Sequence, residues 1–148
     1  MNQFDAVEIL IVEDNPNDAE LTVRVLREQN LANQIFIAED GAEALDFIFC
    51  RGKYAERNPC KPMKVVFLDL KLPKVSGLEV LKEIKANEKT KKLPVVIVTS
   101  SQEDPDIQTA YDLGANSYIV KPVQFDSFRK AMSNAGLYWL LINQPPKG

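Results

Sequence analysis

The chain has 148 residues, of which 45% are hydrophobic and 26% charged, a composition that fits one soluble domain with an ordinary core. Its formal net charge of −3 argues against binding nucleic acid or an anionic membrane through bulk positive charge. The absence of histidine excludes His-ligated zinc, Ser-His-Asp and Cys-His nucleophile systems, and a histidine phosphocarrier. Any chemistry must therefore come from carboxylates, hydroxyls and lysines.

The sequence carries no signal that would direct it into or across a membrane. No run approaches 18 uncharged apolar residues, and the first residues lack a basic segment followed by an apolar one. We therefore expect a cytoplasmic protein in which Cys50 and Cys60 are free thiols. We expect one domain over residues 1–148, with an ordered core over about 8–142 and a tail over 143–148.

Five short runs rich in β-branched residues predict β-strands. They are Glu8–Val12, Gln34–Ala38, Lys64–Leu68, Pro94–Val98 and Ser117–Val120. Three of these runs are almost continuously apolar, which is typical of strands covered on both faces in a parallel sheet.

Amphipathic segments alternate with these runs and predict helices. They are Asp18–Glu28, Ala42–Phe49, Leu78–Ile84, Asp106–Leu113 and Phe125–Ile142. In the second segment, the spacing places Ala44, Leu45, Ile48 and Phe49 toward the core. Pro16 suits a first helical turn after Asn15. The alternation predicts an α/β fold, a doubly wound five-stranded parallel sheet flanked by five helices. One connection is long, Arg51–Met63; it is polar, and loops of this length are commonly functional or mobile.

Polar residues stand where the predicted strands end. Glu13 and Asp14 follow the first strand, Asp69 follows the third, Thr99 follows the fourth and Lys121 follows the fifth. Each residue alone most commonly serves as a turn, a helix cap or a solvated charge. Ligands of parallel α/β sheets bind outside the carboxyl ends of the strands, where the topology brings these four positions together. The set as a whole therefore favours a functional site.

The chemistry of this set points to a phosphoryl group. Three neighbouring carboxylates repel one another and must protonate or recruit a cation. Because histidine and cysteine ligands are missing, the oxygen donors select a hard cation, Mg²⁺. Lys121 adds a positive charge and Thr99 adds a hydroxyl donor. A metal, an ammonium and a hydroxyl around one carboxylate form a socket in which that carboxylate can act as a nucleophile.

The chain resembles the receiver domain of two-component response regulators from Ile9 to about Phe128. The resemblance lies in four motifs that occur in the expected order, LIVEDNPND, VFLDLKLPKVSGLEVL, PVVIVTSS and GANSYIVKP. It implies a flavodoxin-like sheet with strand order 2-1-3-4-5. It also implies that Asp69 accepts a phosphoryl group from a histidine kinase, and that Asp14, Asp69 and the backbone carbonyl of Lys71 ligate Mg²⁺ while Glu13 holds a metal-bound water.

The resemblance also assigns roles to residues around the phosphoryl group. Thr99 and Lys121 would contact the phosphoryl oxygens, and Tyr118 would be the aromatic switch residue coupled to Thr99. Lys71 and Ser101, two positions after Asp69 and Thr99, stand where receivers tune the lifetime of the phosphoryl group. We expect the side chain of Lys71 to slow self-dephosphorylation.

Output is expected to come through a protein–protein surface, because no DNA-binding or enzymatic module follows the receiver motifs. The end of the last predicted helix is apolar all round, which suggests an interface. The interface candidates are Leu137, Tyr138, Trp139 and Leu141. The long loop and this ending resemble stand-alone receivers partnered with bacterial phytochrome-type histidine kinases, several of which dimerise through the face of the fourth helix, fifth strand and fifth helix. The alternative is that the helix end folds back on its own domain.

Three other functions are alternatives to a phosphorylated receiver. A haloacid-dehalogenase-type phosphatase needs a second aspartate two residues after the nucleophile, where this chain has Lys71. A flavodoxin needs a phosphate loop after the first strand, where Glu13 and Asp14 would repel phosphate. A receiver-shaped adaptor that is never phosphorylated stays open, although such adaptors commonly lose an acceptor-site residue. We expect no turnover of an external substrate, only self-phosphorylation and slow self-dephosphorylation.

Overall fold

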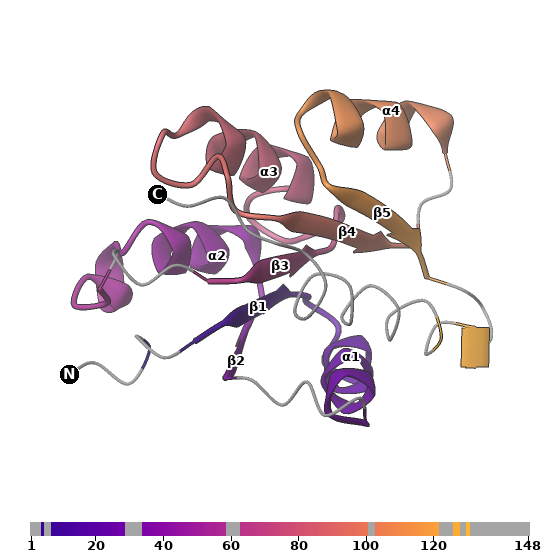
Figure 1. Cartoon of the computed structure of the whole chain (residues 1–148), viewed down its shortest axis with the longest axis horizontal. Helices are drawn as coiled ribbons and strands as arrows, with labels where there is room; N and C mark the ends of the chain where they lie inside the picture. The colour runs from indigo at the N-terminus through magenta and orange to yellow at the C-terminus, as the bar shows by residue number, and fades with distance from the viewer. Residues whose placement is uncertain are drawn as a thin grey trace.

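The centre of the molecule is a parallel sheet with the strand order β2-β1-β3-β4-β5 (Figure 1). The computed structural model describes residues 4, 7–28, 34–58, 63–100, 103–121, 126, 127 and 130. The strands are β1 (Ile9–Val12), β2 (Ile35–Ala38), β3 (Val65–Leu68), β4 (Val95–Thr99) and β5 (Ser117–Val120). All four neighbouring pairs are parallel, which confirms the predicted sheet and its order.

Helices cover both faces of this sheet. They are α1 (Pro16–Glu28), α2 (Gly41–Ile48), α3 (Gly77–Ala86) and α4 (Asp104–Asp112), with a short 3₁₀ helix η2 (Gly52–Tyr54) after α2. Figure 1 shows α1 on one face and α2 and α3 on the other. None of the helices in the described part of the chain has the length and apolarity that crossing a membrane requires.

Alternate residues of each central strand enter two separate cores. Leu10 and Val12 of β1 pack with α2 and α3, whereas Ile9 and Ile11 pack with Val25 and neighbouring residues of α1. This is the two-residue period of a strand, with both faces covered. The burial of every residue of β1, β3 and β4 explains why these runs are nearly continuous in apolar residues.

Side-chain caps set where the helices begin. The Asn15 Oδ1 accepts hydrogen bonds from the backbone N–H groups of Asn17 and Asp18 at 2.9 and 3.2 Å, so α1 starts at Pro16 as expected. In the same way, Asp40 caps α2 and Ser76 caps α3. The first turns of these helices therefore have fixed positions relative to the strand ends.

The connection after α2 is more ordered than the sequence predicts, and the predicted fifth helix is described only in part. The predicted polar connection after α2 contains η2, and Tyr54 is buried there among the rings of Phe4, Phe36 and Phe47. Of the predicted fifth helix, 125–142, the structure describes only residues 126, 127 and 130, which are helical. The remaining residues of that segment, the tail over 143–148 and Cys60 lie outside the described residues.

Candidate functional site

The site lies where the strands end, at the carboxyl edge of the sheet. Val12, the last residue of β1, pairs with Ala38 of β2 and with Leu68 of β3, so these three strands stop at the same level. The backbone N–H of Asp69 donates to the Val12 carbonyl at 3.1 Å, and the N–H of Lys121 donates to the Thr99 carbonyl at 2.7 Å. The ladder thus brings Asp69 beside Val12, although the two residues are 57 positions apart in sequence.

Three carboxylates form an acidic cluster at this edge. Glu13, Asp14 and Asp69 each offer one oxygen, and these oxygens lie within 4.8 Å of one another. Glu13 and Asp69 are buried, while Asp14 is exposed to solvent. A donor set made only of oxygens, partly buried and open on one side, fits a hard divalent cation. The cluster therefore can hold a divalent metal, as the sequence predicts.

Lys121 neutralises part of this negative charge. Its Nζ donates to Glu13 Oε1 at 2.5 Å and to Asp69 Oδ2 at 3.0 Å. A third bond, also of 3.0 Å, goes to Asp18 Oδ2 in the first turn of α1. The ammonium, which has three N–H donors, is thereby surrounded by three carboxylates.

The charges of Glu13 and Lys121 depend on each other. Burial raises the pKa of the Glu13 carboxyl to about 7; the charge of Asp69 adds to this increase, and the hydrogen bond from Lys121 opposes it. For Lys121, burial alone lowers the pKa, but the hydrogen bonds to Glu13 and Asp18 outweigh burial and raise the pKa above its ordinary value. Lys121 is therefore a cation at neutral pH, and its hydrogen bond lowers a Glu13 pKa that burial raises.

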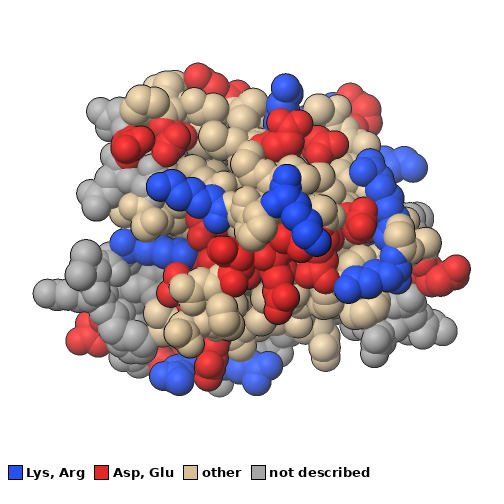
Figure 2. Space-filling view, turned by 180° about the vertical axis from the view of Figure 1, so that it is seen from behind, with Lys and Arg blue, Asp and Glu red and all other residues tan. Residues whose placement is uncertain are grey.

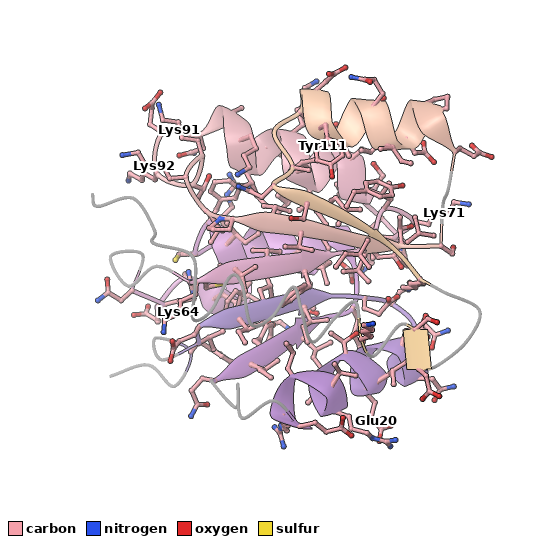
Figure 3. The ribbon with its side chains drawn as sticks, turned by 45° about the vertical axis from the view of Figure 1, so that its right-hand side comes forward. Glu20, Lys64, Lys71, Lys91, Lys92 and Tyr111 are labelled. Atoms are coloured by element: carbon pink, nitrogen blue, oxygen red, sulfur yellow. The ribbon has the colours of Figure 1, made fainter. Side chains whose placement is uncertain are left out.

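The loop after β3 presents Asp69 to this cluster. The backbone N–H of Lys71 donates to Asp69 Oδ1 at 3.3 Å, and the Lys71 side chain is exposed (Figure 3). The N–H of Gly77 donates to the Leu70 carbonyl at 2.8 Å. A Cβ on Gly77 would lie 2.0 Å from the Asp69 carbonyl oxygen. Only glycine therefore allows α3 to begin this close to the end of β3.

The predicted switch residues lie on the two strands at one side of the site. Thr99 ends β4 and is fully buried, and Tyr118 of β5 is half-buried. The Tyr118 ring lies next to the ring of Tyr111 of α4, with the ring centroids 6.5 Å apart and the planes inclined by 38°. The two tyrosines connect the β4–β5 side of the site with the surface of α4.

One site residue was not predicted. The sequence places Asp18 in a helix but gives it no role, whereas the structure places its carboxylate on Lys121. The available signal is its spacing: Asp18 follows Asp14 by four residues, and a helix that starts at the carboxyl edge turns its first residues toward the site.

Other predicted residues lie outside the described residues. They are Ser101, Leu137, Tyr138, Trp139 and Leu141. Their assignments as lifetime-tuning and interface residues stay predictions.

Known proteins match this chain over most of its length. A profile of the response regulator receiver domain matches residues 9–133. Response regulator Rcp1 from Synechocystis sp. is 36% identical over 132 residues, which are 89% of this chain and 88% of Rcp1. The crystal structure of the Mn²⁺-bound form of Rcp1 has a TM-score of 0.87 and 33% identity, covering 94% of this chain and 98% of that one.

Two further solved structures are similar. The phosphorylated cyanobacterial phytochrome response regulator RcpA has a TM-score of 0.87 and 32% identity, covering 94% of this chain and 97% of that one. The bacteriophytochrome response regulator AtBRR has a TM-score of 0.72 and 48% identity, covering 92% and 96%. Since fold, acidic site and sequence matches all agree, the chain belongs to the family of response regulator receiver domains, and phytochrome response regulators are among the proteins it is similar to.

Proposed function

We propose that this protein is a single-domain response regulator in a phosphorelay, in which Asp69 accepts a phosphoryl group from a sensor histidine kinase in a Mg²⁺-dependent reaction. The observation that carries the proposal is the surrounding of Asp69. Its buried carboxylate lies in one cluster with those of Glu13 and Asp14, and its Oδ2 is 3.0 Å from the ammonium of Lys121. A nucleophilic carboxylate beside a divalent-cation site and a fixed cation suits phosphoryl transfer.

The acidic cluster is the place for the metal. Asp14, Asp69 and the backbone carbonyl of Lys71 are the proposed Mg²⁺ ligands, and Glu13 the residue that holds a metal-bound water. When bound, Mg²⁺ neutralises negative charge on the phosphoryl oxygens. The similar protein Rcp1 has been crystallised in an Mn²⁺-bound form, which supports a divalent cation at this place.

The residues of the chain supply position and charge for the transfer. An oxygen of Asp69 forms a bond to phosphorus while the bond from phosphorus to the donor's histidine nitrogen breaks, and that nitrogen keeps the electron pair. Lys121 offers a positive charge to the negative charge that builds on the phosphoryl oxygens. Asp69 is held by its strand end and by the N–H of Lys71, so its orientation is set before the donor arrives.

The signal leaves the site through Thr99 and Tyr118. Thr99 turns its hydroxyl toward the phosphoryl oxygen, and Tyr118 takes up the space that this opens, which changes the surface of α4 and β5. The proposed output is a protein–protein contact, with a homodimer through the face of α4, β5 and the predicted fifth helix as one form of it. The phytochrome response regulators among the similar proteins favour a phytochrome-like histidine kinase as the partner, in the cytoplasm.

Intact-mass spectrometry tests the proposal. The protein is incubated with acetyl phosphate and Mg²⁺, and the same mixture with excess chelator serves as a control. We expect one phosphoryl mass on the wild type, none on Asp69→Asn and none with chelator. An unmodified wild type would favour the adaptor that binds partners without phosphorylation, and a modified Asp69→Asn would overturn Asp69 as the acceptor.

A further inference from the structure

Asp18 gives the site a third carboxylate on Lys121, beyond the acidic cluster. Its Oδ2 lies 3.0 Å from the ammonium, the same distance as that of Asp69 Oδ2. The backbone of Asp18 is fixed from both sides, because its N–H donates to Asn15 Oδ1 at 3.2 Å and its carbonyl accepts the Thr22 hydroxyl at 2.9 Å. The backbone that carries this carboxylate is therefore fixed by the first turn of α1.

The three partners of Lys121 differ in their exposure to water. The side chain of Asp18 is 37% exposed, whereas those of Glu13 and Asp69 are 7% and 10% exposed. A buried carboxylate that loses its cation is not solvated by water, so the loss costs much free energy. An exposed carboxylate replaces the ammonium by water, and this costs little free energy. Of the three contacts, the one to Asp18 is therefore the easiest to give up.

An incoming phosphoryl group competes with these contacts. The ammonium of Lys121 has three N–H donors, and three carboxylate oxygens already accept from it. To accept a hydrogen bond from Lys121, an oxygen of a phosphoryl group on Asp69 must therefore replace one of these three carboxylate oxygens. The carboxylate of Asp18 contacts the same ammonium as the carboxylate of Asp69. Its negative charge therefore repels a phosphoryl group that is bound to Asp69.

We propose that Asp18 is a positioning residue for Lys121. While Asp69 is unmodified, Asp18 holds the ammonium at the site. When a phosphoryl group arrives, Asp18 releases one N–H of Lys121, which then donates to the phosphoryl group. The negative charge of Asp18 lowers the affinity of the site for that group. This inference rests on the proposed function and adds a residue that regulates the same site.

A structural role alone would give a different result. Asp18 is the third residue of α1, where a negative charge also stabilises the helix N-terminus. Removing a carboxylate that only stabilises the helix lowers the free energy of unfolding and leaves the affinity for a phosphoryl mimic unchanged. Competition for Lys121 instead makes the affinity for the mimic higher when the charge is removed.

The test is the apparent Kd for beryllofluoride, a phosphoryl mimic, at saturating Mg²⁺, followed by ¹⁹F NMR on the full chain. We expect Asp18→Asn to bind about threefold to fivefold more tightly than the wild type, since exposed ion pairs contribute up to about 1 kcal/mol. The gain shrinks at high salt because the carboxylate is solvent-accessible. Asp18→Glu, which keeps the charge, binds like the wild type.

The matched control is Glu20→Gln. Glu20 lies on the same helix and carries the same charge, but its partner is Arg24, at 3.9 Å (Figure 3). An unchanged Kd in Asp18→Asn, or an equal gain in Glu20→Gln, overturns the inference. A wild type that binds no beryllofluoride would instead overturn the proposed function, so the two failures are distinguishable. Urea unfolding of each variant confirms that it is folded.

Discussion

At the scale of single residues, Lys121 controls the charge balance of the site. It is the cation shared by Glu13, Asp18 and Asp69, and an arriving metal must share two of these carboxylates with it. The ammonium and the metal therefore compete, although both are needed for a phosphoryl group. Burial is the main cause of the raised pKa of Glu13, and the hydrogen bond from Lys121 opposes it.

We predict that Lys121→Met binds Mg²⁺ about tenfold more tightly than the wild type, because the competing charge is gone, yet gains less phosphoryl mass from acetyl phosphate. Calorimetric titration with Mg²⁺ measures the first effect and mass spectrometry the second. Lys92→Met is the control: Lys92 is exposed and precedes β4, at the opposite edge of the sheet, so its loss leaves both quantities unchanged. Weaker Mg²⁺ binding by Lys121→Met contradicts the competition.

Residues that directly follow strands could be predicted, because parallel pairing fixes where their side chains go. The ladder places Glu13, Asp69 and Lys121 at the same edge of the sheet, and the sequence shows which residues stand at its end. Asp18 could not be predicted in this way. Its contact depends on the direction in which α1 leaves the sheet and on the reach of the Lys121 side chain, and neither appears in the sequence pattern.

At the scale of elements, the approach of α3 to the end of β3 shapes the acceptor loop. We predict that Gly77→Ala lowers the free energy of unfolding by about 3 kcal/mol, because the new Cβ meets the Asp69 carbonyl oxygen and the Cα of Leu70, and that it weakens Mg²⁺ binding by displacing Asp69. Urea unfolding and Mg²⁺ titration measure the two effects.

The control for this prediction is a glycine that is strained but remote. Gly114 has a φ of +104° and precedes β5 at the amino edge of the sheet. Gly114→Ala is therefore expected to destabilise the fold and to bind Mg²⁺ like the wild type. Equal loss of Mg²⁺ affinity in both variants would show that general destabilisation, rather than the Asp69 loop, is responsible.

A second element-scale feature joins α2 to η2 through Glu43. Its carboxylate accepts from the backbone N–H of Glu39 at 2.9 Å and from the Tyr54 hydroxyl at 2.8 Å, and pairs with Lys53 at 3.2 Å. Burial alone raises the pKa of Glu43, but these contacts outweigh it, and the pKa lies below its ordinary value of 4.5.

We predict that Glu43→Gln lowers the free energy of unfolding by about 1 kcal/mol at neutral pH. Because the pKa of Glu43 is lower in the folded than in the unfolded state, its contribution is complete above pH 4.5 and is lost as the pH falls through the folded value. In urea unfolding at a series of pH values, the difference between wild type and Glu43→Gln should therefore shrink on acidification. A difference that stays constant contradicts this.

The sequence predicts the boundaries of the described helices and strands to within one or two residues. It predicts less well which side chains are buried, because burial also depends on the neighbouring elements. The spacing within α2 predicts Phe49 toward the core, and Phe49 packs against the core while half-buried at the helix end; Phe47, which the spacing does not single out, is fully buried. Phe47 is covered because its ring stacks on Phe36 of β2 at 4.4 Å and meets Tyr54 of η2 at 5.1 Å. The periodicity of α2 alone does not show that Phe36 and Tyr54 cover Phe47.

At the scale of the whole molecule, the alternation of strands and helices was enough to predict the doubly wound sheet, since apolar runs buried on both faces leave few other architectures. The distribution of charge was not predictable from the net charge of −3. Figure 2 shows a face on which Asp and Glu side chains gather at the centre, with Lys and Arg side chains around them. The fold thus concentrates like charges that are scattered along the sequence.

The most direct test of the account is a crystal structure of the full chain with Mg²⁺ and beryllofluoride. We predict a metal ion between Asp14, Asp69 and the Lys71 carbonyl, and a beryllofluoride group on Asp69 that contacts Lys121 and Thr99. Asp69 without the beryllofluoride group at saturating concentrations, with the carboxylates of Glu13, Asp14 and Asp69 turned apart and no ion between them, would contradict it.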